Sequence, residues 1–169
     1  MSRVQASAAA FAVALAVLAA DQATKAWVRA EVPGGEHKPV LPGLDLVNVR
    51  NDGIAFGLFS GGGVVIVLIA LVALVAVLAF FVTHIATALM WLPTGLLVGG
   101  ALGNLVDRAR EGAVTDFIDL PYWPAFNLAD SAITVGVVLL LYLLEGPPAR
   151  RREEAVRGTR AGAEPAAKS

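Results

Sequence analysis

Three short clusters of carboxylate, amide and basic residues carry most of the chemistry that this 169-residue chain offers. Each cluster has the i, i+3, i+4 spacing that places side chains on one face of a helix. The clusters are Asp21, Thr24 and Lys25; Asn104, Asp107 and Arg108; and Asn127, Asp130 and Ser131. Two further aspartates, Asp116 and Asp119, lie between the second cluster and the third. The chemistry available to the chain is therefore mainly that of carboxylates.

Aspartates that lie a few ångströms apart share a proton, because two neighbouring negative charges repel each other. One carboxylate can then act as a base toward water while the other acts as an acid toward a carbonyl group, as in an aspartic peptidase. The same groups also suit binding of a divalent cation, or proton transfer in a transporter. The spacing of the residues does not choose between these three functions.

Other catalytic schemes lack the residues that they need. The chain has no cysteine, which excludes a disulfide scaffold, thiolate metal sites and a cysteine nucleophile. The sequence has no HExxH zinc motif, and we expect His37 alone in a loop and His84 at the opposite end of the helices. Ser131 therefore lacks a partner for a serine triad, apart from His37. A formal net charge of −1 argues against nucleic acid as a partner.

The elements that would position these clusters are apolar helices. Hydrophobic residues make up 57% of the chain, and no Asp, Glu, Lys or Arg occurs from Gly53 to Val106. A helix needs about 20 apolar residues to cross a bilayer. Four segments qualify, at about residues 7–28, 64–82, 86–106 and 126–144. Pro93 is expected to kink the third helix or to delay its start. The sequence therefore predicts an all-α membrane protein with four transmembrane helices.

Four spans place both termini on the same side of the membrane. Arg3 and the triplet at residues 150–152 indicate that this side is the cytoplasm, by the positive-inside rule. The first and third spans then end, and the fourth begins, at the extracytoplasmic face, where all three clusters meet. Ordinary interfacial residues would explain one cluster, but short Asp and Asn side chains in all three favour a polar pocket.

Residues 1–148 are predicted to form one domain, and residues 149–169 a polar, disordered cytoplasmic tail. The Ala-rich first span could also be a cleaved signal peptide, but the amphipathic continuation at residues 21–27 favours an uncleaved helix. Gly95, Gly99 and Gly103 recur every four residues and predict close helix packing. The alternative, a phosphate-binding loop, lacks the lysine and the preceding strand that it needs.

Two loops are expected at the extracytoplasmic end. The first contains an alternating segment at residues 44–50, which predicts a short strand or hairpin, followed by a turn signal at residues 51–53. The second, at residues 109–125, is expected to carry Asp116 and Asp119 to the same side as the clusters.

Five sequence blocks, in this order, resemble those of bacterial lipoprotein signal peptidases, which are membrane aspartic peptidases of prolipoproteins. The blocks are DQATK at residues 21–25, NDGIAFG at 51–57, GGALGNLVDR at 99–108, GAVTDFID at 112–119 and FNLADS at 126–131. The resemblance implies that Asp116 and Asp130 are the catalytic pair and activate a water molecule without a covalent intermediate, metal or cofactor. It implies supporting or substrate-binding roles for Asp21, Lys25, Asn51, Gly53, Asn104, Asp107, Arg108 and Asn127. Asp107 is the main rival for a place in the catalytic pair.

The resemblance also implies four transmembrane helices in the bacterial cytoplasmic (inner) membrane, with a small extracytoplasmic β-element and a loop over the site. The expected substrate is a prolipoprotein with a diacylglyceryl group on a cysteine, cleaved just before that cysteine amid membrane lipid, and globomycin-type peptides are expected to inhibit. Asp52 departs from the uncharged or basic residue more common in the family, which bears on substrate preference. A proton-coupled transporter and a non-catalytic lipid-binding protein remain as alternatives, although transporter sites usually lie at the membrane midplane.

Overall fold

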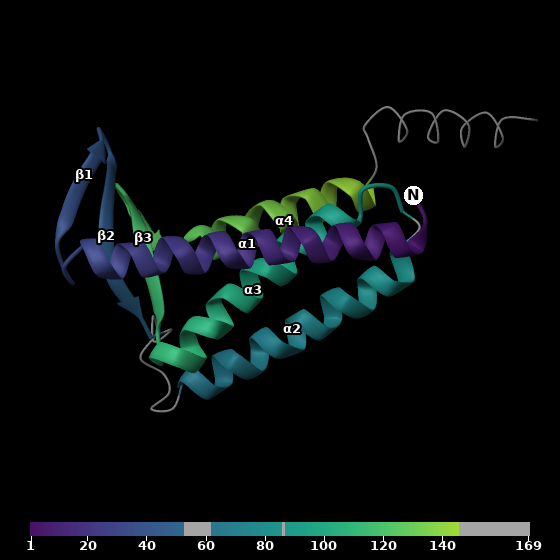
Figure 1. Cartoon of the computed structure of the whole chain (residues 1–169), viewed down its shortest axis with the longest axis horizontal. Helices are drawn as coiled ribbons and strands as arrows, with labels where there is room; N and C mark the ends of the chain where they lie inside the picture. The colour runs from purple at the N-terminus through teal and green to yellow at the C-terminus, as the bar shows by residue number, and fades with distance from the viewer. Residues whose placement is uncertain (53–61, 86, 146–169) are drawn as a thin grey trace, which may run out of the picture.

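The computed structural model describes residues 1–52, 62–85 and 87–145, which form four helices and one four-stranded antiparallel sheet. The helices are α1 (Arg3–Glu31), α2 (Gly62–His84), α3 (Trp91–Glu111) and α4 (Leu128–Glu145). The strands are β1 (His37–Leu41), β2 (Leu44–Asn51), β3 (Val114–Leu120) and β4 (Trp123–Phe126). Figure 1 shows the sheet at one end of the helices, next to the C-terminal end of α1. Gly53 and the tail from residue 146 onward lie outside the described residues.

Three of the described helices are long and apolar enough to cross a membrane: α1, α4 and the part of α2 from Val67 onward. The prediction of several apolar helices of membrane-spanning length is confirmed for these three. The first helix begins with a capping box, in which Ser2 and Gln5 bond to each other's backbone N–H groups. It continues without a break to Glu31, so the polar residues at its end are helical, as predicted.

The third helix begins at Trp91, five residues later than the start predicted at residue 86. Pro93 then lies in the first turn, where a missing backbone N–H has no cost. The delayed start expected from this proline is confirmed. The helix ends at Glu111, and the next residue, Gly112, has a φ of 76° and forms a left-handed cap that glycine adopts without strain.

Close packing through the glycine stripe brings α3 against α1. A methyl group on Gly95 would lie 2.7 Å from the carbonyl oxygen of Ala10, and one on Gly99 would lie 2.6 Å from that of Ala14. Any side chain at these positions would therefore push the helices apart. The helix-packing interpretation of the stripe is confirmed, and α3 contacts each of the other three helices.

The sheet has the strand order β1-β2-β3-β4. The first two strands confirm the hairpin predicted in the first loop. The second loop was predicted without strands, and this was wrong, because residues 114–120 and 123–126 form a second hairpin. Pairing with β2 explains the difference, since Val49 lies opposite Asp116 and Asp45 opposite Asp119. Asp116 therefore lies on a paired strand and not on a free loop.

Candidate active site

Lys25 lies at the centre of a polar cluster that joins the helices at the sheet end. Its side chain is completely buried, and its Nζ lies 2.9 Å from Asp21 Oδ2 and 3.2 Å from Asp107 Oδ2. The same Nζ donates a 2.9 Å hydrogen bond to Asn104 Oδ1. An ammonium group has three N–H donors, and these three contacts give each donor one partner. The charge of Lys25 thus holds α1 against α3.

The carboxylates of Asp21 and Asp107 are occupied by contacts that hold the fold. Gln22 Nε2 donates to Asp107 Oδ1 at 3.0 Å and to Asp21 Oδ2 at 3.3 Å. The second oxygen of Asp21 accepts from the backbone N–H of Ala129 at 3.0 Å, which joins α1 to α4. Asp107 Oδ2 accepts from the backbone N–H of Thr115 at 3.0 Å, which joins α3 to β3. Both carboxylates therefore connect elements to one another.

Sequence reasoning did not single out Gln22, Arg29 or Thr115 as members of this cluster. Arg29 Nη1 donates to Thr115 Oγ1 at 3.0 Å and lies 3.8 Å from Asp107 Oδ1. Its spacing of four residues from Lys25 was a usable signal, because it places both on one helix face. Thr115 carried no such signal, since its position depends on the pairing of β3.

Asp116 and Asp130 are linked through Asn127. Asn127 Nδ2 donates to Asp116 Oδ1 at 2.6 Å, while its Oδ1 accepts from the backbone N–H of Asp130 at 2.9 Å. Asp130 Oδ2 in turn accepts from the backbone N–H of Asn127 at 3.3 Å. This reciprocal pair of bonds has the pattern of a helix cap at the start of α4. One buried amide thus fixes the relative positions of both carboxyl groups.

Asn104 connects this pair to the lysine cluster. Its Nδ2 donates to Asp130 Oδ1 at 2.8 Å, and its Oδ1 accepts from Lys25 Nζ and, at 3.3 Å, from Asn127 Nδ2. The predicted convergence of the three helix ends is confirmed by these bonds. Thr24 and Ser131 do not take part, because their hydroxyl groups bond to carbonyl oxygens of their own helix or its cap.

Asp116 is only 2% exposed on β3, where its Oδ2 accepts a 2.9 Å hydrogen bond from Asn51 Nδ2. Burial raises the pKa of this carboxyl above its usual value, and the nearby charge of Asp130 raises it further. The hydrogen bonds from Asn51 and Asn127 and the charge of Lys25 act in the opposite direction but do not cancel the rise in pKa. Asp116 therefore keeps a proton at a higher pH than an exposed aspartate does.

Arg108 borders a cleft that, among the other predicted site residues that the structure describes, only Asn104 also lines. Its Nη1 donates to the carbonyl oxygen of Asn104 at 3.3 Å. The cleft has a volume of about 290 Å³ and lies between α2, α3 and α4, and its remaining lining is apolar. The cleft therefore leads from an apolar helix surface to the residue that contacts Asp130.

The expectation that His37 is alone in a loop was wrong. His37 lies on β1, with its Nδ1 3.2 Å from Asp119 Oδ2 and 3.8 Å from Asp45 Oδ2. Sequence spacing could not show this, because the three residues come together only through strand pairing.

The helices, three of which are long and apolar enough to cross a membrane, thus have a linked pair of aspartates at the end next to the sheet. The chain belongs to the signal peptidase II family, because the family model described as "Signal peptidase (SPase) II" matches residues 13–145. A lipoprotein signal peptidase of Syntrophomonas wolfei is 46% identical over 131 residues, which cover 77% of this chain and 88% of that protein. One of Halothermothrix orenii is 37% identical over 135 residues, covering 79% of this chain and 93% of that protein.

Solved structures agree with this assignment. One, described as a bacterial membrane enzyme, has a TM-score of 0.74 and 35% identity, over 78% of this chain and 89% of the other. A second with the same description has a TM-score of 0.72 and 31% identity, over 94% of both chains. The family resemblance found in the sequence is thus confirmed, and these relatives give no support to a transporter or a lipid-binding scaffold.

Proposed function

We propose that this chain removes the signal peptides of lipid-modified prolipoproteins, with Asp116 and Asp130 as its catalytic residues. The observation that carries the residue assignment is the buried amide of Asn127, which bonds to Asp116 and to the backbone of Asp130. The substrate class comes from the relatives that are named lipoprotein signal peptidases. The substrate carries a diacylglyceryl group on a cysteine, and the bond before that cysteine is cleaved.

Asp107 and Asp21 are weaker candidates for catalysis. Lys25 contacts both carboxylates, and backbone N–H groups occupy one further oxygen of each. A carboxylate that is held by a buried cation is poorly suited to exchange protons with water during a reaction. Asp116 and Asp130, in contrast, are bonded by amide and backbone donors, with no ion pair among the described residues.

In the proposed reaction, Asp116 holds the shared proton and Asp130 is ionised, in keeping with the raised pKa of Asp116. Asp130 takes a proton from water, whose oxygen attacks the peptide carbonyl carbon while Asp116 protonates the carbonyl oxygen. The C–N bond of the tetrahedral product then breaks, as Asp116 takes a proton from one of its hydroxyl groups and Asp130 gives its proton to the amine of the lipidated cysteine that leaves. No covalent enzyme intermediate, metal or cofactor takes part.

We propose that α3 is the fourth transmembrane helix. Its 21 residues give a length of about 30 Å, which matches the hydrocarbon thickness of a bilayer. Its contacts with α1, α2 and α4 support a position inside the bundle. Both termini then lie in the cytoplasm of a bacterial inner membrane, consistent with Arg3 and the arginines at residues 150–152. The sheet and the aspartate pair lie at the extracytoplasmic face.

The apolar cleft between α2, α3 and α4 is the proposed path for the lipid-anchored substrate. Ile69 and Leu74 on α2, Leu97 on α3 and Ile133 on α4 line it, and Asn104 borders it. An acyl chain or signal-peptide helix there would contact membrane lipid on one side and reach Asp130 through Asn104 on the other. Residues 1–148 form the peptidase domain in this proposal, residues 149–169 form a cytoplasmic tail, and globomycin-type cyclic peptides inhibit.

The test is cleavage of a diacylglyceryl-modified prolipoprotein by the purified full chain in detergent, followed by gel shift with EDTA present. We expect cleavage by the wild type and a loss of about 10⁴-fold or more with Asp116→Asn or Asp130→Asn, within the range found for paired catalytic groups. Glu36→Gln is the matched control, because Glu36 is an exposed carboxylate at the same end of the molecule. It is expected to cleave at the wild-type rate.

Unfolding curves separate a catalytic loss from a folding defect. Asp130→Asn replaces one of two acceptor oxygens with an NH₂ group, so its stability must be measured alongside its activity. The assignment fails if a folded Asp116→Asn variant still cleaves while a folded Asp107→Asn variant does not. Absence of cleavage by a folded wild-type chain would count against the proposed function itself.

A further inference from the structure

Three potential metal ligands from three strands converge on the sheet. They are separate from the Asp116 and Asp130 pair. His37 on β1, Asp45 on β2 and Asp119 on β3 each offer one ligand atom, and these atoms lie within 4.8 Å of one another. Within residues 1–52, 62–85 and 87–145, this is the only such group of three histidine or acidic residues. None of the three has a role in the reaction proposed above.

The strand register brings these residues to one face of the sheet. Asp45 and Asp119 are direct partners across β2 and β3, and His37 is the partner of Val47 across β1 and β2. Val47 and Asp45 are two residues apart on one strand, so they share a face, and their partners share it too. Like charges directly opposite each other destabilise a strand pair. A cation between Asp45 and Asp119 would remove that cost.

The two distances from the His37 nitrogen suit a small transition-metal ion. Zn²⁺ binds imidazole nitrogen and carboxylate oxygen at about 2.0–2.2 Å, so ligand atoms of a tetrahedral site lie roughly 3.3–3.6 Å apart. His37 Nδ1 is 3.2 Å from Asp119 Oδ2, just below this range, and 3.8 Å from Asp45 Oδ2, just above it. Imidazole also favours Zn²⁺ and similar ions over Mg²⁺ and Ca²⁺, which prefer oxygen ligands alone.

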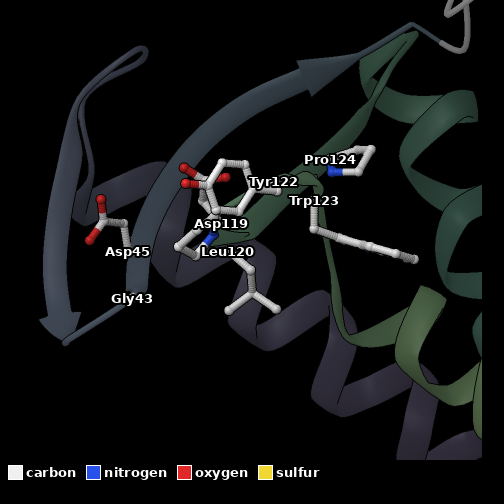
Figure 2. A pocket seen from close by; sticks show the side chains of 8 residues that line it. Gly43, Asp45, Asp119, Leu120, Tyr122, Trp123 and Pro124 are labelled. Atoms are coloured by element: carbon white, nitrogen blue, oxygen red, sulfur yellow. The ribbon is translucent and has the colours of Figure 1, made fainter.

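Two of the ligands, Asp45 and Asp119, line a groove of about 620 Å³, together with Tyr122 and other residues. Figure 2 shows the residues that line this groove, with Asp45 on one strand and Asp119 on the next. The side chain of His37 is 58% exposed, so an ion from solution can reach all three ligands. Three protein ligands leave one position of a tetrahedral ion for water.

We propose that His37, Asp45 and Asp119 bind one divalent transition-metal ion, for which Zn²⁺ is the best match, and that the ion cross-links β1, β2 and β3. The ion lies on the sheet and not at the aspartate pair, so the peptide cleavage remains a metal-free reaction. Its effect is to fasten together the strands of the sheet, including β3, which carries Asp116 three residues before Asp119.

The test measures Zn²⁺ binding by the full chain in detergent, purified without a histidine tag and titrated against a chromophoric chelator. We expect one Zn²⁺ per wild-type chain and a visible absorption spectrum when Co²⁺ replaces Zn²⁺. His37→Gln is expected to weaken binding about 100-fold or more, because loss of even an indirect metal contact costs 10–100-fold. His84→Gln is the matched control, since it removes the other histidine of the chain and is expected to bind as the wild type does.

Asp119→Asn provides a second ligand variant, so that the result does not depend on His37→Gln alone. The proposal is supported if both variants lose the Zn²⁺ and the Co²⁺ spectrum while melting like the metal-free wild type. It is overturned if the wild type binds no more Zn²⁺ than His37→Gln does, which would mean that His37 contacts the two aspartates without a metal ion. It is equally overturned if Asp116→Asn, and not His37→Gln, abolishes binding. These readouts are independent of prolipoprotein cleavage.

Discussion

Replacement of Lys25 by methionine tests the polar cluster most directly. The Lys25 ammonium group is completely buried and contacts Asp21, Asn104 and Asp107. Methionine keeps a similar length but removes the charge and all three donors. Removal of one partner from a buried ion pair costs about 3–5 kcal/mol, and here two carboxylates lose their cation. We therefore expect the free energy of unfolding to fall by about 5 kcal/mol, at the upper end of that range.

The assay is equilibrium unfolding in mixed detergent micelles, with prolipoprotein cleavage measured on the same samples. Cleavage is expected to fall as well, because Asn104 bonds to both Lys25 and Asp130. Lys38→Met is the matched control, since Lys38 is exposed on β1 and surface substitutions usually change stability by less than about 0.5 kcal/mol. Asp21→Asn added to Lys25→Met is expected to restore part of the loss, because it removes one of the two uncompensated charges.

The electrostatic reasoning is refuted if Lys25→Met unfolds at the wild-type denaturant concentration and cleaves at the wild-type rate. It is refuted in part if Lys25→Met is destabilised but the added Asp21→Asn lowers stability further. That result would mean that the Asp21 bond to Ala129, and not its charge, dominates its contribution.

Three further predictions follow from the same contacts. Asn51→Ala removes a hydrogen bond that lowers the pKa of Asp116, so the pKa rises further and the loss of cleavage at alkaline pH moves to higher pH. Profiles of kcat/KM against pH measure this, and a shift to lower pH would contradict it. Gly103→Ala places a methyl carbon 2.5 Å from Asp21 Oδ2, so we expect a loss of about 1–3 kcal/mol in unfolding experiments. Gly34→Ala, where nothing lies within 4 Å of the added carbon, should unfold as the wild type does. EDTA is expected to leave the cleavage rate of His37→Gln unchanged, since this variant lacks the proposed sheet ion, and inhibition of this variant that added Zn²⁺ reverses would indicate a metal-dependent reaction.

The helical part of the site could be predicted because its signals are local. Asp21 and Lys25 are one helical turn apart, and so are Asn104 and Arg108, so spacing alone identifies shared faces. The glycine stripe predicted a close helix contact for the same reason, but only the structure shows that the partner is α1. The lengths of the apolar segments predicted four spans, and the alternating directions of those spans placed these faces at one end of the bundle.

The sheet part of the site could not be predicted from local signals. The segment at residues 114–120 is rich in strand-forming residues, but its pairing with β2 depends on a partner about 65 residues away, as Asn51 and Asp116 illustrate. The neighbours of His37 follow from the same long-range register. Asp107 contacts Lys25 on α1 and Thr115 on β3. The second contact could not be predicted, because residues 114–120 were expected to form a loop.

The composition of α3 has a consequence for how the protein enters the bilayer during synthesis. Among the described helices, α3 is the one that falls short of a membrane span by apolar content, and its Asn104 and Asp107 bond to residues of α1. Polar groups in hydrocarbon are costly unless a neighbouring helix satisfies them. In the proposed four-span topology, the translocation machinery therefore has to keep α1 beside the pore until α3 emerges, so that the two helices partition into lipid as a pair.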